Sequence, residues 1–111
     1  MRVRPIKPVI IANGGAGGIN YAQRRDRGLR KAVEAGYEIL NSHGSSLDAV
    51  VQAVSLLEDN PVFNAGTGST LGLTGEAEMD ASVMTSDGGF GAVAGIREVR
   101  NPIQVARLVM E

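Results

Sequence analysis

Apolar residues follow two spacings along the chain, and each spacing predicts one type of element. Val9–Ala12 is a continuous apolar run rich in β-branched residues, which is typical of a buried strand. From Tyr21 to Leu40 the apolar residues recur at helical spacing, so this stretch is predicted to be a helix with one apolar stripe. The stripe consists of Leu29, Ala32, Val33, Gly36, Tyr37 and Leu40.

A second helix is predicted after the polar turn Asn41–Gly44. Ser45 is placed to cap this helix, with Asp48 three residues later. The pair Asn60-Pro61 ends it, because the residue before a proline is disfavoured in the α region. Its apolar stripe consists of Leu47, Val50, Val51, Val54 and Leu57.

Glycines divide the next part of the chain into strands. Ser69–Thr74 and Glu76–Met84 are predicted as two strands joined at Gly75. A third strand, Gly91–Val99, is predicted after the turn Asp87–Gly89. Each boundary contains glycine, which allows backbone conformations that other residues rarely adopt.

Asn101 and Pro102 predict the start of a last helix, since asparagine favours the N-cap and proline the first turn. Its predicted apolar face is Ile103, Ala106, Val109 and Met110. The chain stops at Glu111 inside this helical pattern, without a glycine cap or a proline after it. We therefore expect the chain to continue into a second piece.

The composition excludes several classes of protein. The chain has no cysteine, which excludes a disulfide framework, a thiol nucleophile and a cysteine zinc site. No run approaches the ~18 apolar residues of a membrane span. Val9–Ala12 is too short for the core of a signal peptide. The expected location is cytoplasmic, with no membrane partner.

Glycine is frequent and aromatic residues are rare. Glycine makes up 15 of 111 residues, about twice its ordinary share of ~7%. The aromatic residues are two tyrosines and two phenylalanines. A chain with so little bulky side-chain volume builds a thin core, so we expect it to bury one face against a partner.

The glycine loop Asn13–Gly18 follows the first predicted strand, a position where nucleotides bind in other folds. The dinucleotide pattern would require glycine at position 20, which is Asn20. The Walker pattern fails as well, because the sequence has no Gly-Lys pair. A nucleotide site is therefore disfavoured, and binding of another anion to the loop amides stays an alternative.

Basic residues gather in the first predicted helix, as they do in many nucleic-acid-binding proteins. No aromatic residue lies among them to stack on bases. A solvated helix face is favoured, and no nucleic-acid partner is expected. The basic residues are Arg24, Arg25, Arg27, Arg30 and Lys31.

Two further groups of polar residues have the chemistry of a site. Glu76, Glu78 and Asp80 alternate along a predicted strand and so share one face, where carboxylates can bind a divalent cation. A solvent-facing strand surface is the favoured interpretation. The single histidine, His43, lies beside glycine in a polar turn and is expected to be solvated, not a base or a ligand.

An ordered set of motifs resembles the α-subunit of the plant-type asparaginase family, also called isoaspartyl aminopeptidases. The resemblance covers nearly the whole chain, and Asn13–Gly17 is similar to the family's N-terminal glycine motif. The other matching segments are Ser46–Val50, Leu56–Pro61, Phe63–Ser69, Glu78–Met84, Gly91–Gly95, Asn101–Ile103 and Ala106–Glu111.

The resemblance implies an α+β fold, the αββα sandwich of the N-terminal-nucleophile hydrolases. Residues 1–111 would be the α-subunit portion of one such domain, completed by a β-subunit cut from the same precursor. A threonine at the start of the β-subunit would attack the side-chain amide of asparagine or the bond of a β-aspartyl dipeptide. The usual assembly is a dimer of αβ units.

The resemblance also implies roles for residues of this chain. Asn64 matches the asparagine beside the nucleophilic threonine, and Gly14, Gly15 and Gly17 form a structural glycine loop. No organic cofactor is expected. A sodium ion would be bound by main-chain carbonyls of one loop. The carbonyls belong to Leu57, Glu58, Asn60, Phe63, Ala65 and Thr67.

The sequence departs from the family at Asn13, where the family usually has histidine. No threonine here begins a segment similar to the start of the β-subunit, so this chain alone is expected to be inactive. The alternative is a non-catalytic binding module, or a degenerate relative without a β-partner. Free asparagine and isoaspartyl peptides both stay open as the preferred substrate.

Overall fold

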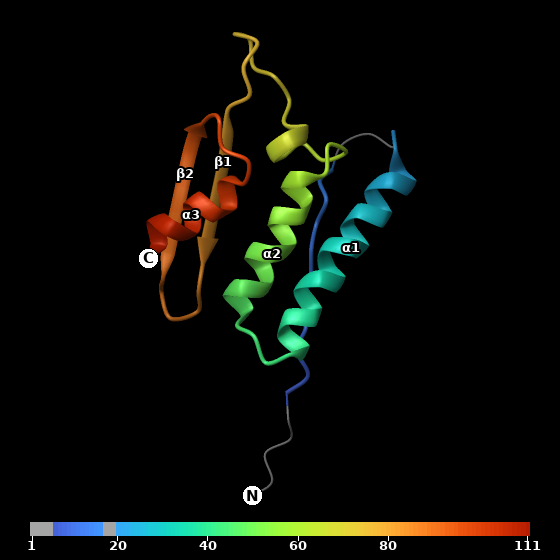
Figure 1. The fold of residues 1–111 in the computed structure, drawn as a ribbon, viewed down its shortest axis with the longest axis vertical. Helices are drawn as coiled ribbons and strands as arrows, with labels where there is room; N and C mark the ends of the chain where they lie inside the picture. Colours follow the sequence, from blue (N-terminus) through green and yellow to red (C-terminus); the bar gives the residue numbers. More distant parts are fainter. Residues whose placement is uncertain (1–5, 17–19) are drawn as a thin grey trace, which may run out of the picture.

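A computed structural model of the chain describes residues 6–16 and 20–111. Two helices lie side by side, and a two-stranded antiparallel sheet with a third helix packed against it lies beyond them (Figure 1). The described residues are therefore of the α+β class, as the family resemblance implies. The elements are α1 (Ala22–Asn41), α2 (Ser46–Asp59), a 3-10 turn η1 (Gly66–Gly68), β1 (Met79–Met84), β2 (Phe90–Ile96) and α3 (Pro102–Met110).

Helices α1 and α2 form where the sequence predicts them, because their ends are determined locally. The backbone N–H of Asp48 donates to Ser45 Oγ at 3.0 Å, which confirms the predicted N-cap of α2. At the end of α1, Gly44 N–H donates to the carbonyl oxygen of Ile39 at 2.8 Å. His43 is exposed, as predicted, and its φ of 65° turns the chain out of the helix.

The apolar core lies between α2, α3 and the sheet. Its buried residues include Val51, Val83, Ile103 and Ala106, which confirms two members of the predicted face of the last helix. Val109 was expected on the same face, but 58% of it is exposed. It follows Ile103 by six positions, which turns its side chain about 120° away around the helix axis.

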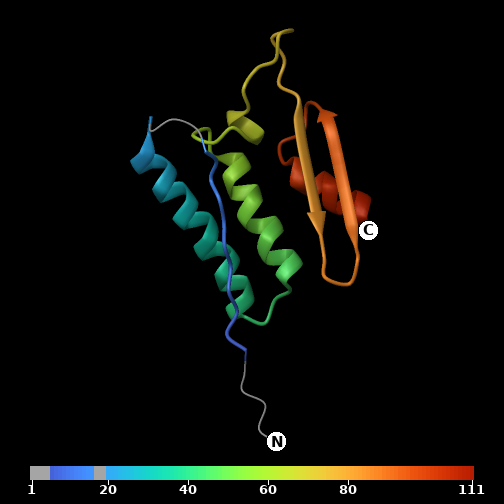
Figure 2. The ribbon, with the colours of Figure 1, turned by 180° about the vertical axis from the view of Figure 1, so that it is seen from behind.

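The hairpin β1–β2 closes through the predicted turn, where Gly88 N–H donates to the Thr85 carbonyl oxygen at 3.1 Å. Strand β1 begins at Met79 and β2 ends at Ile96, so both strands are shorter than predicted. Helix α3 covers one face of this hairpin, as both views show (Figures 1 and 2).

The predicted strand Val9–Ala12 is wrong for the described residues, because this segment is extended but pairs with no described strand. It runs along the two long helices, seen in front of them in Figure 2. Ile10 packs against Gly36 of α1, where an added Cβ would lie 2.5 Å from its Cδ1. Ile11, which points the other way, is 89% exposed.

The predicted strand Ser69–Thr74 is also wrong, since these residues form a loop. Gly75 N–H donates to the Gly72 carbonyl oxygen at 3.0 Å, which closes a small turn instead of extending the sheet. Leu73 at this turn is fully exposed. Among residues 6–16 and 20–111, no helix has both the length and the apolarity needed to cross a membrane.

Candidate functional site

A cavity of about 420 Å³ lies between the glycine loop and the loop that follows α2. Asn13, Gly14 and Gly15 form one wall, and Asn64 belongs to the opposite wall. The structure therefore brings together two groups that the sequence places 50 residues apart. Gly17, the third glycine of the predicted loop, lies outside the described residues.

The ring of Phe63 joins the two walls of this cavity. Only 5% of Phe63 is exposed. An added Cβ on Gly14 would lie 3.0 Å from the ring, and one on Gly28 of α1 would lie 2.8 Å from it. Glycine at these two positions thus lets the glycine loop and α1 approach the ring closely. The side chain of Asn13 also shapes the loop, because its Oδ1 accepts the N–H of Gly15 at 2.8 Å.

The carboxamide of Asn64 has a defined orientation. Its Oδ1 accepts the backbone N–H of Thr70 at 2.8 Å. Since a backbone N–H only donates, the acceptor is the carbonyl oxygen, and the amide nitrogen points elsewhere. Within the described residues that nitrogen has no acceptor. From the cavity wall, the Asn64 amide nitrogen can therefore donate hydrogen bonds to an oxygen atom of a bound molecule.

The loop with the predicted sodium ligands curls tightly on its own carbonyl groups. An added Cβ on Gly68 would collide with the Phe63 carbonyl oxygen, and one on Gly66 would collide with that of Glu58. Both oxygens belong to the predicted set, and glycine is what lets the backbone approach them. The predicted carbonyls of Leu57, Asn60 and Ala65 accept backbone N–H groups of the loop.

A carbonyl oxygen has two lone pairs, so one hydrogen bond leaves it able to bind a cation. Oxygen ligands suit hard cations. The donor chemistry and the crowding at the two glycines therefore fit the predicted site. The sixth carbonyl in the predicted set, Thr67, belongs to η1.

The side chain of Glu58 is a feature that the sequence analysis missed. Only 3% of Glu58 is exposed, and its Oε2 accepts the N–H of Ile103 at 3.1 Å. Burial raises the pKa of this carboxyl, because the charged form loses its hydration. Glu58 follows Val51 and Val54 by seven and four positions, so helical spacing places it on the apolar stripe. That spacing was the available signal.

Beside Glu58, polar contacts join α2 to the two residues that precede α3. Arg100 Nε lies 2.9 Å from Asp59 Oδ1, and this hydrogen bond lowers the pKa of the Asp59 carboxyl. Asn101 occupies the N-cap position of α3, as predicted, but its side chain makes no capping bond. Its Nδ2 donates instead to Asp59 Oδ1 at 3.1 Å and to the Ser55 carbonyl oxygen at 3.3 Å.

The basic side chains of α1 lie mostly in solvent, which confirms the expected helix face. Arg24 lies over the ring of Tyr21, and Arg30 pairs with Asp26 at 2.9 Å. Arg25 differs from this expectation, because it is half-buried and lines the cavity. The periodicity of α1 does not reveal this, because the residues across the cavity from Arg25 come from other parts of the chain.

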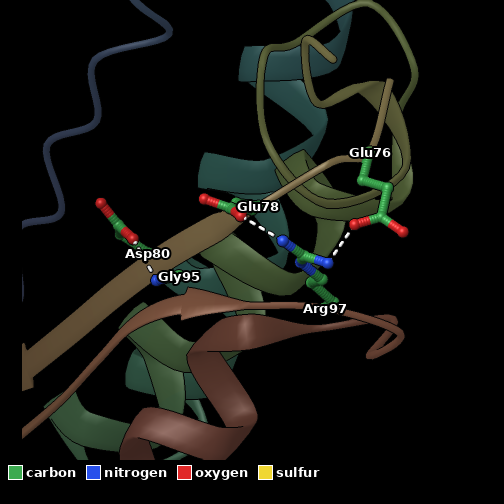
Figure 3. A network of polar contacts seen from close by, with 5 residues as sticks. All are labelled: Glu76, Glu78, Asp80, Gly95 and Arg97. Carbon is green, nitrogen blue, oxygen red and sulfur yellow. Dashed lines mark hydrogen bonds and ion pairs between the residues drawn. The ribbon is translucent and has the colours of Figure 1, made fainter. Parts of the chain in front are cut away.

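The three acidic side chains before and in β1 do not form a cation site. Arg97 pairs with both Glu76 and Glu78, and Asp80 Oδ1 accepts the N–H of Gly95 at 2.8 Å (Figure 3). Their charges are thus used to join the two strands. The described part of the chain holds no group of three or more His, Cys, Asp or Glu residues suited to a metal ion.

Comparison with known proteins gives consistent matches. The family model described as asparaginase matches residues 6–111. The chain is 50% identical to an isoaspartyl peptidase/L-asparaginase of Danio rerio, over 94% of this chain and 34% of that protein. It is 56% identical to a plant-type L-asparaginase of Thermococcus kodakarensis, over 92% of this chain and 34% of that protein. A human isoaspartyl peptidase/L-asparaginase is 46% identical over 96% of this chain and 36% of that protein.

The chain therefore spans about a third of the length of the curated relatives it matches. The residues that the family model matches include both walls of the cavity. Because the family model covers nearly all of its residues, and the relatives share about half of them, this chain belongs to the asparaginase family.

Proposed function

We propose that this chain is the α-subunit portion of an amidohydrolase that cleaves the side-chain amide of asparagine or β-aspartyl peptide bonds. The relatives named L-asparaginase and isoaspartyl peptidase support this activity. The observation that carries the proposal is Asn64, whose amide nitrogen is left as a donor at the cavity wall by the bond to Thr70. The nucleophile is a threonine at the start of a β-subunit.

In this mechanism the threonine hydroxyl oxygen attacks the amide carbon of the substrate. The free amine of the same threonine takes the hydroxyl proton and passes it to the leaving nitrogen. Ammonia or an amine leaves, and an ester to the enzyme remains. Water then attacks this ester, which releases aspartate and restores the hydroxyl. Asn64 Nδ2 donates a hydrogen bond to an oxygen of the reacting group, which favours the build-up of negative charge there.

The loop after α2 gives this donor its place. Its carbonyl groups would hold a sodium ion, which when bound supplies a positive charge that fixes the curled loop. The residues that would hold it are Leu57, Glu58, Asn60, Phe63, Ala65 and Thr67.

The αββα sandwich belongs to this proposal as well. Helix α3 covers the face of the hairpin that carries Val83, whereas Ser82 and Met84 on the other face are exposed. Val9 and Ile11 are exposed along the extended segment. Strands of a β-subunit from the same precursor would cover these side chains, and two αβ units would pair. The chain by itself would be inactive and its location cytoplasmic.

The test uses the complete precursor of this chain and its Asn64→Ala variant. Intact-mass measurement is expected to find a second chain that begins with threonine. The mature protein is expected to hydrolyse asparagine or β-Asp-Leu, and Asn64→Ala is expected to lower kcat by about 100-fold with the fold intact. A folded protein that hydrolyses neither compound would contradict the proposal and support a non-catalytic binding module.

A further inference from the structure

Glu58 has a side chain that neither the predicted ion site nor the chemical step uses. It is almost completely buried, and its Oε1 has no hydrogen-bond partner among the described residues. A buried carboxyl group with an unsatisfied oxygen is destabilising compared with an apolar side chain of the same size. Its presence on the apolar stripe of α2 therefore calls for a role beyond packing.

Three elements meet at Glu58. Glu58 lies near the C-terminal end of α2, and its Oε2 accepts the N–H of Ile103 in the first turn of α3. Its Cβ and carbonyl oxygen face Gly66 of η1, where an added Cβ would lie 2.6 Å from the Glu58 Cβ. A rotation of the Glu58 backbone would therefore move η1.

The turn η1 in turn determines where Asn64 lies. Ser69 N–H donates to the Gly66 carbonyl oxygen at 3.1 Å, and the next residue, Thr70, donates to Asn64 Oδ1. The orientation of the Asn64 amide thus depends on the place of Gly66. Contacts run without interruption from α3 through Glu58 and Gly66 to Asn64.

We propose that the Glu58 side chain is a positioning residue for Asn64. By binding the first turn of α3, it fixes the end of α2 and the turn η1, so that the Asn64 amide is held in place at the cavity. This inference rests on the proposed function of Asn64. Glu58 itself touches no reacting atom.

The first test is a double-mutant cycle in the mature two-chain enzyme with asparagine as substrate. Glu58→Ala is expected to lower kcat by about 10- to 100-fold with KM changed less than about 2-fold, because the donor is misplaced and substrate binding is not. In the Asn64→Ala background the same substitution is expected to change kcat less than about 2-fold. If the loss of kcat in the double variant equals the product of the two single-variant losses, the proposal is overturned.

Two matched variants separate positioning from general stability. Glu58→Gln keeps an oxygen for the Ile103 N–H and is expected to retain kcat within about 3-fold. Arg100→Ala breaks the exposed ion pair between Asp59 of α2 and the segment before α3, and is also expected to leave kcat unchanged. If Glu58→Ala does not fold, Glu58→Asp replaces it, since the shorter side chain cannot reach Ile103. A folded alanine or aspartate variant with full kcat would overturn the proposal.

Amide hydrogen exchange tests the same link without reference to activity. Glu58→Ala is expected to speed amide exchange at Thr70 by at least about 10-fold, whereas Glu58→Gln and Arg100→Ala leave it nearly unchanged. Unchanged exchange at Thr70 in a folded alanine or aspartate variant would overturn the positioning role. An inactive wild-type enzyme would instead contradict the proposed function, and exchange at Thr70 would still decide whether Glu58 orders the loop.

Discussion

The packed region, formed by α2, the hairpin and α3, differs sharply from the N-terminal segment, residues 6–12. In the packed region Val51, Val83 and Ile103 are buried against one another, from three elements of the same chain. In the N-terminal segment Val9 and Ile11 are 75% and 89% exposed, although both are as apolar as the core residues. Apolar side chains are thus buried by other parts of this chain in the packed region, whereas in the N-terminal segment they face solvent.

The difference indicates what each region requires. Burial of apolar surface stabilises the packed region directly. The N-terminal segment has extended backbone and exposed β-branched side chains, which are the features of a strand that pairs with further chain. A β-subunit that adds strands beside this segment, as proposed above, would remove the difference. Substitutions in each region therefore test whether the two regions differ in their contribution to stability.

The largest effect is expected for Ile103→Ala in the packed region. The side chain is 3% exposed, and its loss leaves a cavity, so the free energy of unfolding should fall by about 3 kcal/mol. Ile11→Ala is the matched variant and should change it by less than about 0.5 kcal/mol in this chain alone. Urea unfolding of the two variants measures both values. Equal losses would show that the two regions are alike.

A second effect is expected where the loop after α2 curls on itself. A methyl group at Gly68 meets the backbone oxygens of Phe63 and Pro61, which cannot move aside as a side chain can. Gly68→Ala should therefore lower the free energy of unfolding by about 2 kcal/mol. Gly72→Ala is the control, because the nearest atom is the Glu76 carbonyl oxygen at 3.5 Å. Thermal unfolding measures the stability of both variants. Equal midpoints would show that the loop adjusts to the added methyl group at Gly68, contrary to this prediction.

The smallest effects concern pH, where adjacent carboxyl groups are expected to act in opposite directions. The pKa of Asp59 is lowered by the hydrogen bond from Arg100, so its stabilising contribution is present above its ordinary pKa of 3.8 and is lost as pH falls through the lower folded value. The pKa of Glu58 is raised by burial, so stability is lost as pH rises from its ordinary 4.5 to the higher folded value.

Stability measured as a function of pH in Asp59→Asn and Glu58→Gln separates the two contributions. The deficit of Asp59→Asn relative to the parent should shrink in acid. Glu58→Gln should gain relative to the parent as pH rises through the range where Glu58 ionises. If the free energy of unfolding of a variant and of the parent depends on pH in the same way, the substituted carboxyl group does not cause the pH dependence.

Elements with local determinants were predictable from the sequence. Ser45 caps α2 by accepting the N–H of Asp48, three residues later, and the turn at Gly88 closes between neighbouring strands. Val9–Ala12 and Ser69–Thr74 were predicted as strands and are not paired, because pairing depends on a neighbour that local composition does not specify.

The candidate site was predictable only in part. The resemblance named Asn64 and the glycine loop, and the structure places both at one cavity. Helical periodicity places Arg25 on the solvated face of α1, but the structure places it at the cavity wall, beside residues from distant parts of the chain. For Glu58 the sequence predicts a role only for the main-chain carbonyl group. The burial of its side chain on the apolar stripe of α2 is not predicted. The burial of both side chains depends on tertiary packing, which local sequence does not specify.

The most direct test of the proposed division of labour compares asparagine hydrolysis by this 111-residue chain with hydrolysis by the mature product of its complete precursor. We predict no hydrolysis by the chain alone, and turnover only when a second chain that begins with threonine is present. Turnover by the 111-residue chain alone would contradict the proposal that its nucleophile lies on another polypeptide.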